Sequence, residues 1–381
     1  MRQLVRVVIF TLVGVLTLNQ FVCAQTVVAS RAILVAVGQQ TPLYSKNAAA
    51  RHSPASITKV LTAVLAIESG RLDEPVTVSA TAPSAGGSSL YIKAGEVYSL
   101  RELLYAAMLI SANDATAAIA EHLGGSISGF AEMMNQRATG LGMANSFFIN
   151  PHGMPEDGQY STAEDLSILG VHAASLPLYL EIASTKRYIL ANGRVVNNQN
   201  KLLNTLGVKA GKTGYTDAAG QCLLTIAEQD GLTLVSVILG SQGQSMWTDT
   251  ASLLDFGFSN YTRRVLVRDK QTIGVTRIPL AGEILLIAKG EVARVYKTSE
   301  TLNLSTEVKV TDRLLPPLRP GQVVGEIIIR NGGVEIARTA LTVPVYIPLV
   351  TTPRIIGILC IMGFLGGTII FRRRWRALNK K

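Results

Sequence analysis

Three short motifs follow one another along the chain: Ser-Ile-Thr-Lys at 56–59, Ser-Ala-Asn at 111–113 and Lys-Thr-Gly at 212–214. Each one alone is a weak signal, because such short motifs also occur by chance in a chain of 381 residues. Together and in this order, they predict a site where a serine hydroxyl attacks an acyl group with help from lysine side chains.

The first motif supplies the nucleophile and its base. Ser56 and Lys59 are three residues apart in a segment of helical periodicity, which predicts one shared helix face about one turn apart. A serine hydroxyl needs a base near neutral pH, and a lysine amine serves as one only when its pKa is lowered. A second cation such as Lys212 would disfavour protonation of Lys59. The alternative, for an isolated pair, is a capping serine and a solvated lysine.

The other two motifs predict groups that surround the nucleophile. Ser111 offers a hydroxyl that passes a proton to a leaving amine, and Asn113 offers an amide for a peptide carbonyl, although Asn113 alone also fits an ordinary helix cap. Lys212 and Thr213 offer a charge and a hydroxyl to a carboxylate. Gly214 permits close approach of an extended peptide to an edge strand. As a bare tripeptide, the third motif also fits a strand end with a solvated lysine.

Periodicity and turn residues predict the elements that position these groups. Strands at both ends of the sequence with helices between them imply one sheet built from distant segments and covered by helices, an α/β (α+β) architecture. After residue 260, short β-prone runs between Gly and Pro turns predict a small all-β domain. The expected elements are a hairpin at 31–45, helices from Pro54 to Gly70, at 100–109, from about 114 to 124 and at 245–258, and strands at 209–215, 220–227 and 232–239.

The net charge of +10 is concentrated at the two ends of the chain. Residues 1–24 and 349–381 contain nine basic residues and no acidic one, so residues 25–348 carry a net charge of only +1. A nearly neutral body argues against nucleic-acid binding, which depends on a basic surface.

Both ends carry apolar runs. Residues 1–24 combine a basic start, a short apolar run and a small-x-small sequence, which is typical of a cleaved signal peptide, with an uncleaved anchor as the alternative. Residues 355–371 are apolar and precede a basic tail, which favours a transmembrane helix over an amphipathic surface helix. The predicted organisation is a signal peptide (1–24), a catalytic domain (25–260), a β-rich domain (261–348), a tether (349–354), a transmembrane helix (355–371) and a basic cytoplasmic tail (372–381).

No metal site and no cofactor are expected. The histidines His52, His122, His152 and His172 show no metal-ligand spacing, and no Gly-x-Ser-x-Gly elbow is present to support a Ser-His-Asp triad. Cys222 lies in an apolar, strand-like run, where it is expected to be a buried small side chain rather than a nucleophile.

Together with Asn-Pro-His-Gly at 150–153 and Gly-Lys-Thr-Gly-Tyr-Thr at 211–216, the motifs resemble the low-molecular-weight penicillin-binding proteins. More narrowly, the chain is similar to the serine-type D-alanyl-D-alanine carboxypeptidases of peptidase family S11. The resemblance covers residues 28–260 strongly, and residues 262–348 look like the C-terminal β domain of that family. It implies a penicillin-binding-protein/β-lactamase-like fold, in which a five-stranded antiparallel sheet lies between helices.

The resemblance also implies the ligands and the roles of the site residues. Peptidoglycan stem peptides and β-lactams would bind. Independently of the resemblance, the signal peptide and the basic tail after residues 355–371 predict export and anchoring in the bacterial cytoplasmic membrane, with the catalytic domain outside. Protein partners are left open by the sequence. The roles carried over are Ser56 as the acylated nucleophile, Lys59 as its base, Ser111 as a proton relay, Asn113 as a substrate ligand, Lys212 and Thr213 as carboxylate ligands beside Gly214, and the backbone N–H groups of Ser56 and Tyr215 as the oxyanion hole.

Two departures from the family pattern bear on specificity. Ala112 replaces a glycine that is common in the second motif, and residues 198–200 and 241–247 lack the arginine that members often carry, so the sequence leaves open what completes the carboxylate clamp. A class A β-lactamase is one alternative, but Glu164 is not followed by the asparagine that such enzymes use. A membrane-tethered wall-binding protein with a silent site is the other, and covalent labelling would distinguish it.

Overall fold

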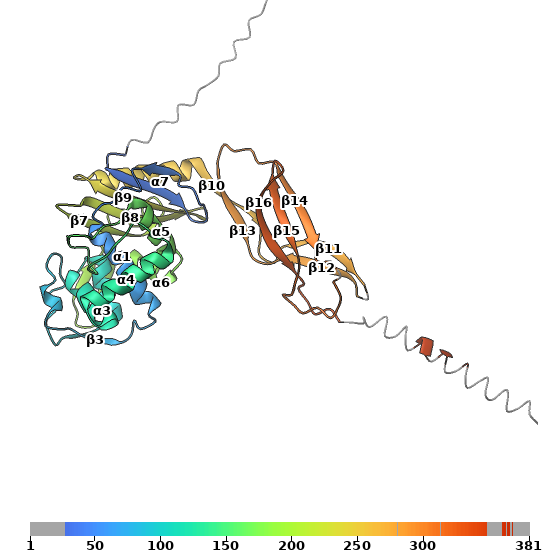
Figure 1. The fold of residues 1–381 in the computed structure, drawn as a ribbon, viewed down its shortest axis with the longest axis horizontal. Coiled ribbons are helices and arrows are strands. Elements are labelled where there is room, and N and C mark those ends of the chain that lie inside the picture. The colour runs from blue at the N-terminus through green and yellow to red at the C-terminus, as the bar shows by residue number, and fades with distance from the viewer. Residues whose placement is uncertain are drawn as a thin grey trace, which may run out of the picture.

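The computed structural model describes residues 27–279, 281–312, 314–348 and six positions between 360 and 368. The predicted signal peptide, tether and basic tail lie outside these residues, as does most of the predicted transmembrane helix. Within the part of the chain that is described, no single helix is long and apolar enough to cross a bilayer. Two bodies follow one another along an elongated molecule (Figure 1).

The first body is built around a five-stranded antiparallel sheet, in the order β2-β1-β9-β8-β7. Arg31 pairs with Leu239, so strands from opposite ends of this body lie side by side, as the sequence predicts. β7 is an edge strand: β8 pairs with one of its sides, and the backbone groups of its other side are not paired with a strand of this sheet. The strands are β1 (Arg31–Ala36), β2 (Tyr44–Lys46), β7 (Val208–Thr216), β8 (Gly220–Gln229) and β9 (Leu232–Ser241).

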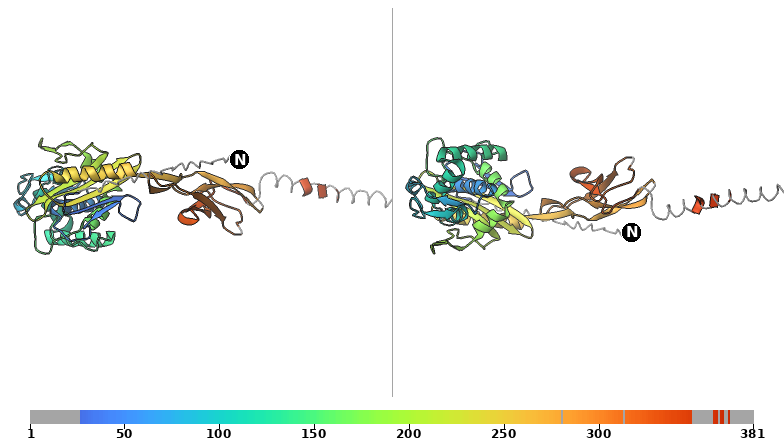
Figure 2. Two further views of the ribbon diagram at one scale, coloured as in Figure 1. Left: turned by 90° about the horizontal axis from the view of Figure 1, so that it is seen from above. Right: turned by 90° about the horizontal axis from the view of Figure 1, so that it is seen from below.

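Helices cover both faces of this sheet (Figure 2). In β9, Leu234 belongs to the core between the sheet and α7 (Ser245–Asn260). Its neighbour Val235 belongs to the larger core on the other face of the sheet, beneath the remaining helices. Successive side chains of a strand point to opposite faces, so an uninterrupted apolar strand requires cover on both. The helices are α1 (Thr58–Glu68), α2 (Leu100–Leu109), α3 (Asn113–Gly124), α4 (Ile127–Leu141), α5 (Ala163–Ala174), α6 (Pro177–Ser184) and α7 (Ser245–Asn260).

The second motif is positioned by the boundary between α2 and α3. The Ser99 side chain accepts a hydrogen bond from the Glu102 backbone, and the Glu102 carboxylate accepts one from the Ser99 backbone, so a capping box fixes the start of α2. α2 ends at Leu109, which leaves Ser111 in the connection before α3. Two short ribbons complete the body: β3 (Pro75–Thr77) with β4 (Val97–Ser99), and β5 (Arg187–Ile189) with β6 (Val195–Asn197).

The second body begins where α7 ends, at Asn260. All regular elements described between residues 261 and 348 are strands, and their core includes Val324, Leu341 and Val343. One ribbon pairs β10 with β13, and a five-stranded sheet has the order β11-β12-β16-β15-β14. The strands are β10 (Tyr261–Val267), β11 (Thr272–Ile278), β12 (Gly282–Ala288), β13 (Val292–Lys297), β14 (Leu304–Val310), β15 (Val323–Asn331) and β16 (Val334–Thr342).

Candidate active site

Ser56 lies in a 3₁₀ turn, Ala55–Ile57, immediately before α1. The predicted shared helix for Ser56 and Lys59 is therefore wrong in detail: only Lys59 is in the α-helix, because Ala55 adopts a positive φ of 46° and the chain enters the helix through the tighter turn. The turn packs against the edge strand β7. A Cβ atom at Gly214 would lie only 2.9 Å from the backbone nitrogen of Ser56, so glycine permits this close approach.

The Lys59 side chain is fully buried, and its amine has three neighbours. Nζ lies 3.0 Å from Ser56 Oγ, 2.6 Å from Asn113 Oδ1 and 2.9 Å from the carbonyl oxygen of His152. The last two oxygens can only accept hydrogen bonds. A neutral amine has two N–H groups and one lone pair, so donating to both acceptors leaves the lone pair directed at the Ser56 hydroxyl. This arrangement prepares Lys59 to take the proton of Ser56.

Asn113 fixes the orientation of that amine. Its Nδ2 donates a hydrogen bond of 2.8 Å to the carbonyl of Gly86, which turns Oδ1 toward Lys59. Ala112, not Asn113, occupies the N-cap position of α3, so the interpretation of Asn113 as a helix cap is wrong. The buried side chain uses one of its two N–H donors on Gly86, which leaves the second available for a ligand.

Burial and charge tune the two lysines. Burial, followed by the charge of Lys212, holds the pKa of Lys59 well below its usual value, while the Asp114 carboxylate acts in the opposite direction. Burial also lowers the pKa of Lys212 to about 7. The Lys212 amine donates a hydrogen bond of 2.8 Å to the carbonyl oxygen of Thr213. The lowered pKa favours the neutral form of Lys59, which is the form a general base requires.

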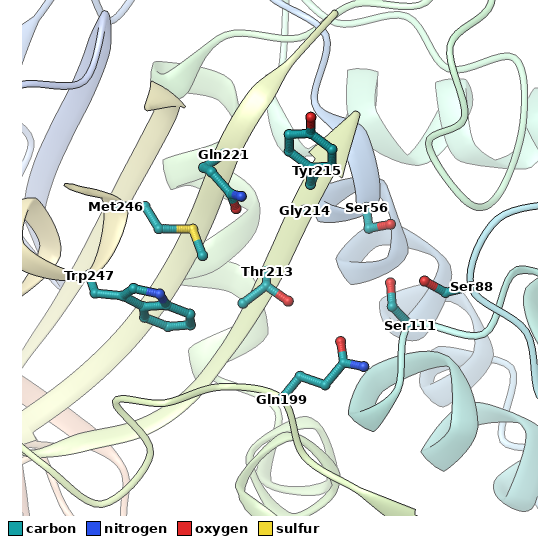
Figure 3. A pocket seen from close by; sticks show the side chains of 10 residues that line it. All are labelled: Ser56, Ser88, Ser111, Gln199, Thr213, Gly214, Tyr215, Gln221, Met246 and Trp247. Carbon is teal, nitrogen blue, oxygen red and sulfur yellow. The ribbon is translucent and has the colours of Figure 1, made fainter. Parts of the chain in front are cut away.

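A pocket of about 300 Å³ opens beside the nucleophile (Figure 3). Ser111, with a positive φ of 63°, places its hydroxyl into this pocket on the side of Ser56. Thr213 and Gly214 of β7 form the opposite wall. The ten lining residues carry no formal charge: Ser56, Ser88, Ser111, Gln199, Thr213, Gly214, Tyr215, Gln221, Met246 and Trp247.

Two contributors were not predicted from the sequence. The loop at 150–153 supplies backbone carbonyls: His152 accepts from Lys59, and Pro151 accepts a hydrogen bond of 2.6 Å from Thr62 of α1. Ser88 lines the pocket, and its carbonyl accepts from the Asn113 backbone at 2.7 Å. The Asn-Pro-His-Gly sequence was the available signal for the first. Nothing in the sequence around Ser88 pointed to the second.

The other chemically capable side chains have structural partners. His52 Nε2 donates a hydrogen bond of 2.8 Å to the Ala219 carbonyl, and His122 and His172 each contact a glutamate. Cys222 is buried, and burial raises the pKa of its thiol to about 11, which suppresses the thiolate. Among the described residues, no group of three or more His, Cys, Asp or Glu side chains could hold a metal ion. Glu164 is exposed at the start of α5 and is not among the lining residues.

Comparison with known proteins places the chain in a class. Residues 19–243 match peptidase family S11, described as D-alanyl-D-alanine carboxypeptidase. The chain is 30% identical over 325 residues to the D-alanyl-D-alanine carboxypeptidase DacF of Bacillus subtilis, with 82% of this chain and 84% of that protein covered. It is 31% identical over 345 residues to DacC of Escherichia coli, with 85% and 86% covered.

Solved structures agree with this comparison. Penicillin-binding protein 5 of Haemophilus influenzae superposes with a TM-score of 0.70 at 27% identity, over 85% of this chain and 98% of that one. Penicillin-binding protein D2 of Listeria monocytogenes, solved in an ampicillin-bound form, gives 0.56 at 30% identity, over 60% and 97%. The fold and the site thus define a serine hydrolase with a penicillin-binding-protein fold. The chain belongs to the D-alanyl-D-alanine carboxypeptidase family, peptidase family S11.

Proposed function

We propose that this carboxypeptidase removes the terminal D-alanine from peptidoglycan stem pentapeptides through an acyl-enzyme at Ser56. The observation that carries the proposal is the Lys59 amine, buried, lowered in pKa and oriented by two acceptors toward Ser56 Oγ at 3.0 Å. An amine in this position can abstract the proton of the Ser56 hydroxyl.

The reaction then proceeds in two halves. The Ser56 proton moves to Lys59 as Oγ bonds to the carbonyl carbon of the penultimate D-alanine, and the backbone N–H groups of Ser56 and Tyr215 stabilise the oxyanion. Ser111 relays the proton from Lys59 to the leaving nitrogen as the C–N bond breaks. A water molecule next attacks the ester carbonyl and gives a proton to Lys59. As the bond between the acyl carbon and Ser56 Oγ breaks, Lys59 passes that proton to Oγ, which releases the shortened peptide and restores the serine.

Substrate binding uses the edge of the sheet. An extended peptide pairs with β7, as peptides do at open strand edges, and Gly214 brings β7 close to the turn that carries Ser56. The Thr213 hydroxyl, which lines the pocket, binds the terminal carboxylate, and Lys212, which is buried and not among the lining residues, adds its charge from behind Thr213. The second N–H of Asn113 donates to a substrate carbonyl. A β-lactam carries an amide in the place of the scissile bond, so it acylates the same oxygen. The ampicillin-bound relative supports this part of the proposal.

We also propose that the enzyme is exported and anchored in the cytoplasmic membrane by residues 355–371, with its catalytic domain outside. The support is the sequence: an apolar run followed by Arg372, Arg373, Arg374 and Arg376. A reporter fused after Lys381 should then behave as cytoplasmic. Reporter activity outside the membrane would contradict this topology.

The direct test of the activity is D-alanine release. The full chain, incubated with a pentapeptide ending in D-alanyl-D-alanine, should yield the tetrapeptide and one free D-alanine, measured by mass. Ser56→Ala, which removes only the attacking oxygen, is the matched control and should release none. The activity proposal fails if folded wild-type protein leaves the pentapeptide intact.

The pH dependence follows from the Lys59 amine. Its neutral form accepts the proton, and its folded pKa is lowered, so kcat/KM should be high above that pKa and fall about tenfold per pH unit below it. Lys212 contributes to lowering the pKa of Lys59, so Lys212→Met should raise it and move the acid limb to higher pH. Profiles of kcat/KM for both proteins test this. An acid limb that stays in place in Lys212→Met would show that the limb belongs to another group.

The uncharged pocket predicts the effect of a new charge. The Gln199 carboxamide reaches toward the gap between Thr213 and Ser111 (Figure 3). Gln199→Arg would add a charge-assisted hydrogen bond to the carboxylate, which is expected to lower KM about tenfold. Peptides with an amidated C-terminus should show no such gain. Gln136→Arg adds the same charge at an exposed position of α4, outside the lining, and serves as the control. Equal effects in both variants would indicate general charge attraction instead of a specific contact.

A further inference from the structure

Four apolar side chains are exposed together at one end of the second body. Leu315, Val323, Val345 and Tyr346 are each between 50% and 58% exposed. Their segments are joined by backbone hydrogen bonds: Leu318 and Ile347 exchange two of 2.9 Å, and the Gly321 N–H donates to the Val343 carbonyl at 2.9 Å. We call this surface, formed by 314–323 and 343–348, the exit pole, because the described β-rich body ends there at residue 348.

The exposure of these side chains comes from a defined backbone. Leu318 and Val343 point into the core of the second body and are almost completely buried. Leu318 and Val343 therefore anchor the two segments to the core of the second body. The exposed apolar side chains of the same segments are not part of that core. Exposed apolar groups gathered in this way commonly mark an interaction surface.

Basic side chains surround the apolar ones. Lys270 and Lys289 line a cavity together with Gly321 and Pro344. Arg319 lies within the exit pole itself, and the side chains of Lys270, Lys289 and Arg319 are all exposed. None of the ion pairs found among the described residues involves any of the three. The nearby acids are Asp269, which accepts a hydrogen bond of 2.7 Å from the Gly290 backbone, and Asp312. An apolar centre with a basic rim is the composition that suits an anionic lipid surface.

We call the first body, which carries the active site, the catalytic body. The exit pole is the end of the second body that lies away from it. β10 starts at Tyr261, directly after α7, and the turn that follows it carries Lys270. At the opposite end of the β15–β16 hairpin, Ile336 shares a cavity wall with Gly38 of the catalytic body. Figures 1 and 2 show the two bodies in line, with the catalytic body at one end.

Chain length limits the distance from the exit pole to the bilayer. Only residues 349–354 separate Pro348 from the apolar run 355–371. Six fully extended residues reach at most about 20 Å. The polar headgroup zone on one side of a bilayer is roughly 5–8 Å thick. An inserted run therefore holds the exit pole at the membrane surface or a short distance above it.

We propose that the exit pole rests on the anionic membrane surface. Leu315, Val345 and Tyr346 enter the boundary between headgroups and acyl chains, and the three cations contact anionic headgroups. This inference rests on the membrane anchoring proposed above. It adds that the folded body itself binds lipid, which sets the catalytic body at a fixed height and orientation above the membrane.

The test uses the full chain in vesicles of phosphatidylglycerol and phosphatidylcholine. Cys23→Ser and Cys360→Ser leave buried Cys222 as the only native cysteine, and Tyr346→Cys or Val334→Cys then receives an environment-sensitive dye. Val334 is the matched control: it is apolar, 68% exposed and located at the opposite end of the same hairpin, about 30 Å away along a nine-residue strand. Lipids that carry a quencher just below the headgroup should quench the dye at 346 and leave the dye at 334 bright.

Flotation separates the two proposals. If the full chain floats with vesicles and the dye at 346 is quenched no more than the dye at 334, anchoring stands and the exit-pole proposal is wrong. If the chain does not float, both proposals fail.

Replacing Lys270, Lys289 and Arg319 by glutamine should reduce quenching at 346 in vesicles that contain phosphatidylglycerol. A dye at 346 that instead changes with protein concentration and not with lipid would assign the surface to a second copy of the chain, and would overturn the proposal.

Discussion

Replacing Lys59 by methionine is expected to slow acylation of Ser56 by about two to four orders of magnitude, the usual contribution of a general base. Methionine keeps most of the side-chain volume in a fully buried site, so the loss isolates the amine from packing. The Asn113 and His152 oxygens would lose their donor, which should lower stability modestly.

The measurement is the second-order rate constant for covalent reaction with a fluorescent penicillin, followed by gel or mass. Thermal unfolding of the same preparation shows that the variant is folded. Lys186→Met, an exposed lysine in the chain segment before β5, controls for loss of a lysine charge. A folded Lys59→Met protein that acylates at nearly the wild-type rate would remove Lys59 from the mechanism.

Gly153→Ala is expected to have the second-largest effect. Gly153 has a φ of +86°, and a Cβ atom there would overlap the carbonyl oxygen of Ala55. Relief requires the loop 150–153 to move away from the turn that carries Ser56. We expect a loss of about 3 kcal/mol in the free energy of unfolding. Because the His152 carbonyl moves with this loop, acylation should also fall by about 100-fold, the cost of misplacing a group by about 1 Å.

Gly140→Ala provides the comparison. Gly140 lies inside α4 with open space around it, so alanine should be neutral or stabilise the helix by about 0.5–1 kcal/mol. Denaturant unfolding and penicillin acylation of both variants give the result. Similar unfolding midpoints for the two variants would show that the loop tolerates a side chain and that its contact with Ala55 is unimportant.

Regular elements of the catalytic body could be predicted because their signals are local. The predicted strands 209–215, 220–227 and 232–239 correspond to β7, β8 and β9. In β8 and β9, buried residues follow one another without interruption through the middle of the strand because both faces of the sheet are covered. Helix 100–109 was predicted with the observed bounds, since a capping box and apolar periodicity agree there.

The finer geometry of the site depends on contacts that no local pattern encodes. Backbone carbonyls of any residue are chemically alike, so the role of His152 as an acceptor for Lys59 has no signal in its side chain. The 3₁₀ turn at Ser56 is packed against Gly153 and Gly214, which come from distant segments and leave no local signal beside Ser56. The interpretation of Asn113 as a cap considered only its neighbours in sequence, whereas its amide bridges Lys59 and Gly86.

The central claim is that Ser56 Oγ forms the covalent bond of the acyl-enzyme, and one measurement tests it most directly. Folded protein is treated with penicillin, digested with trypsin and analysed by mass. Cleavage after Arg51 and Lys59 isolates Ser56 in the peptide 52–59. The account predicts that the mass of the penicilloyl group is added to this peptide, at Ser56, and that Ser56→Ala protein carries no adduct. An adduct on any other peptide, or none in folded wild-type protein, would contradict the account.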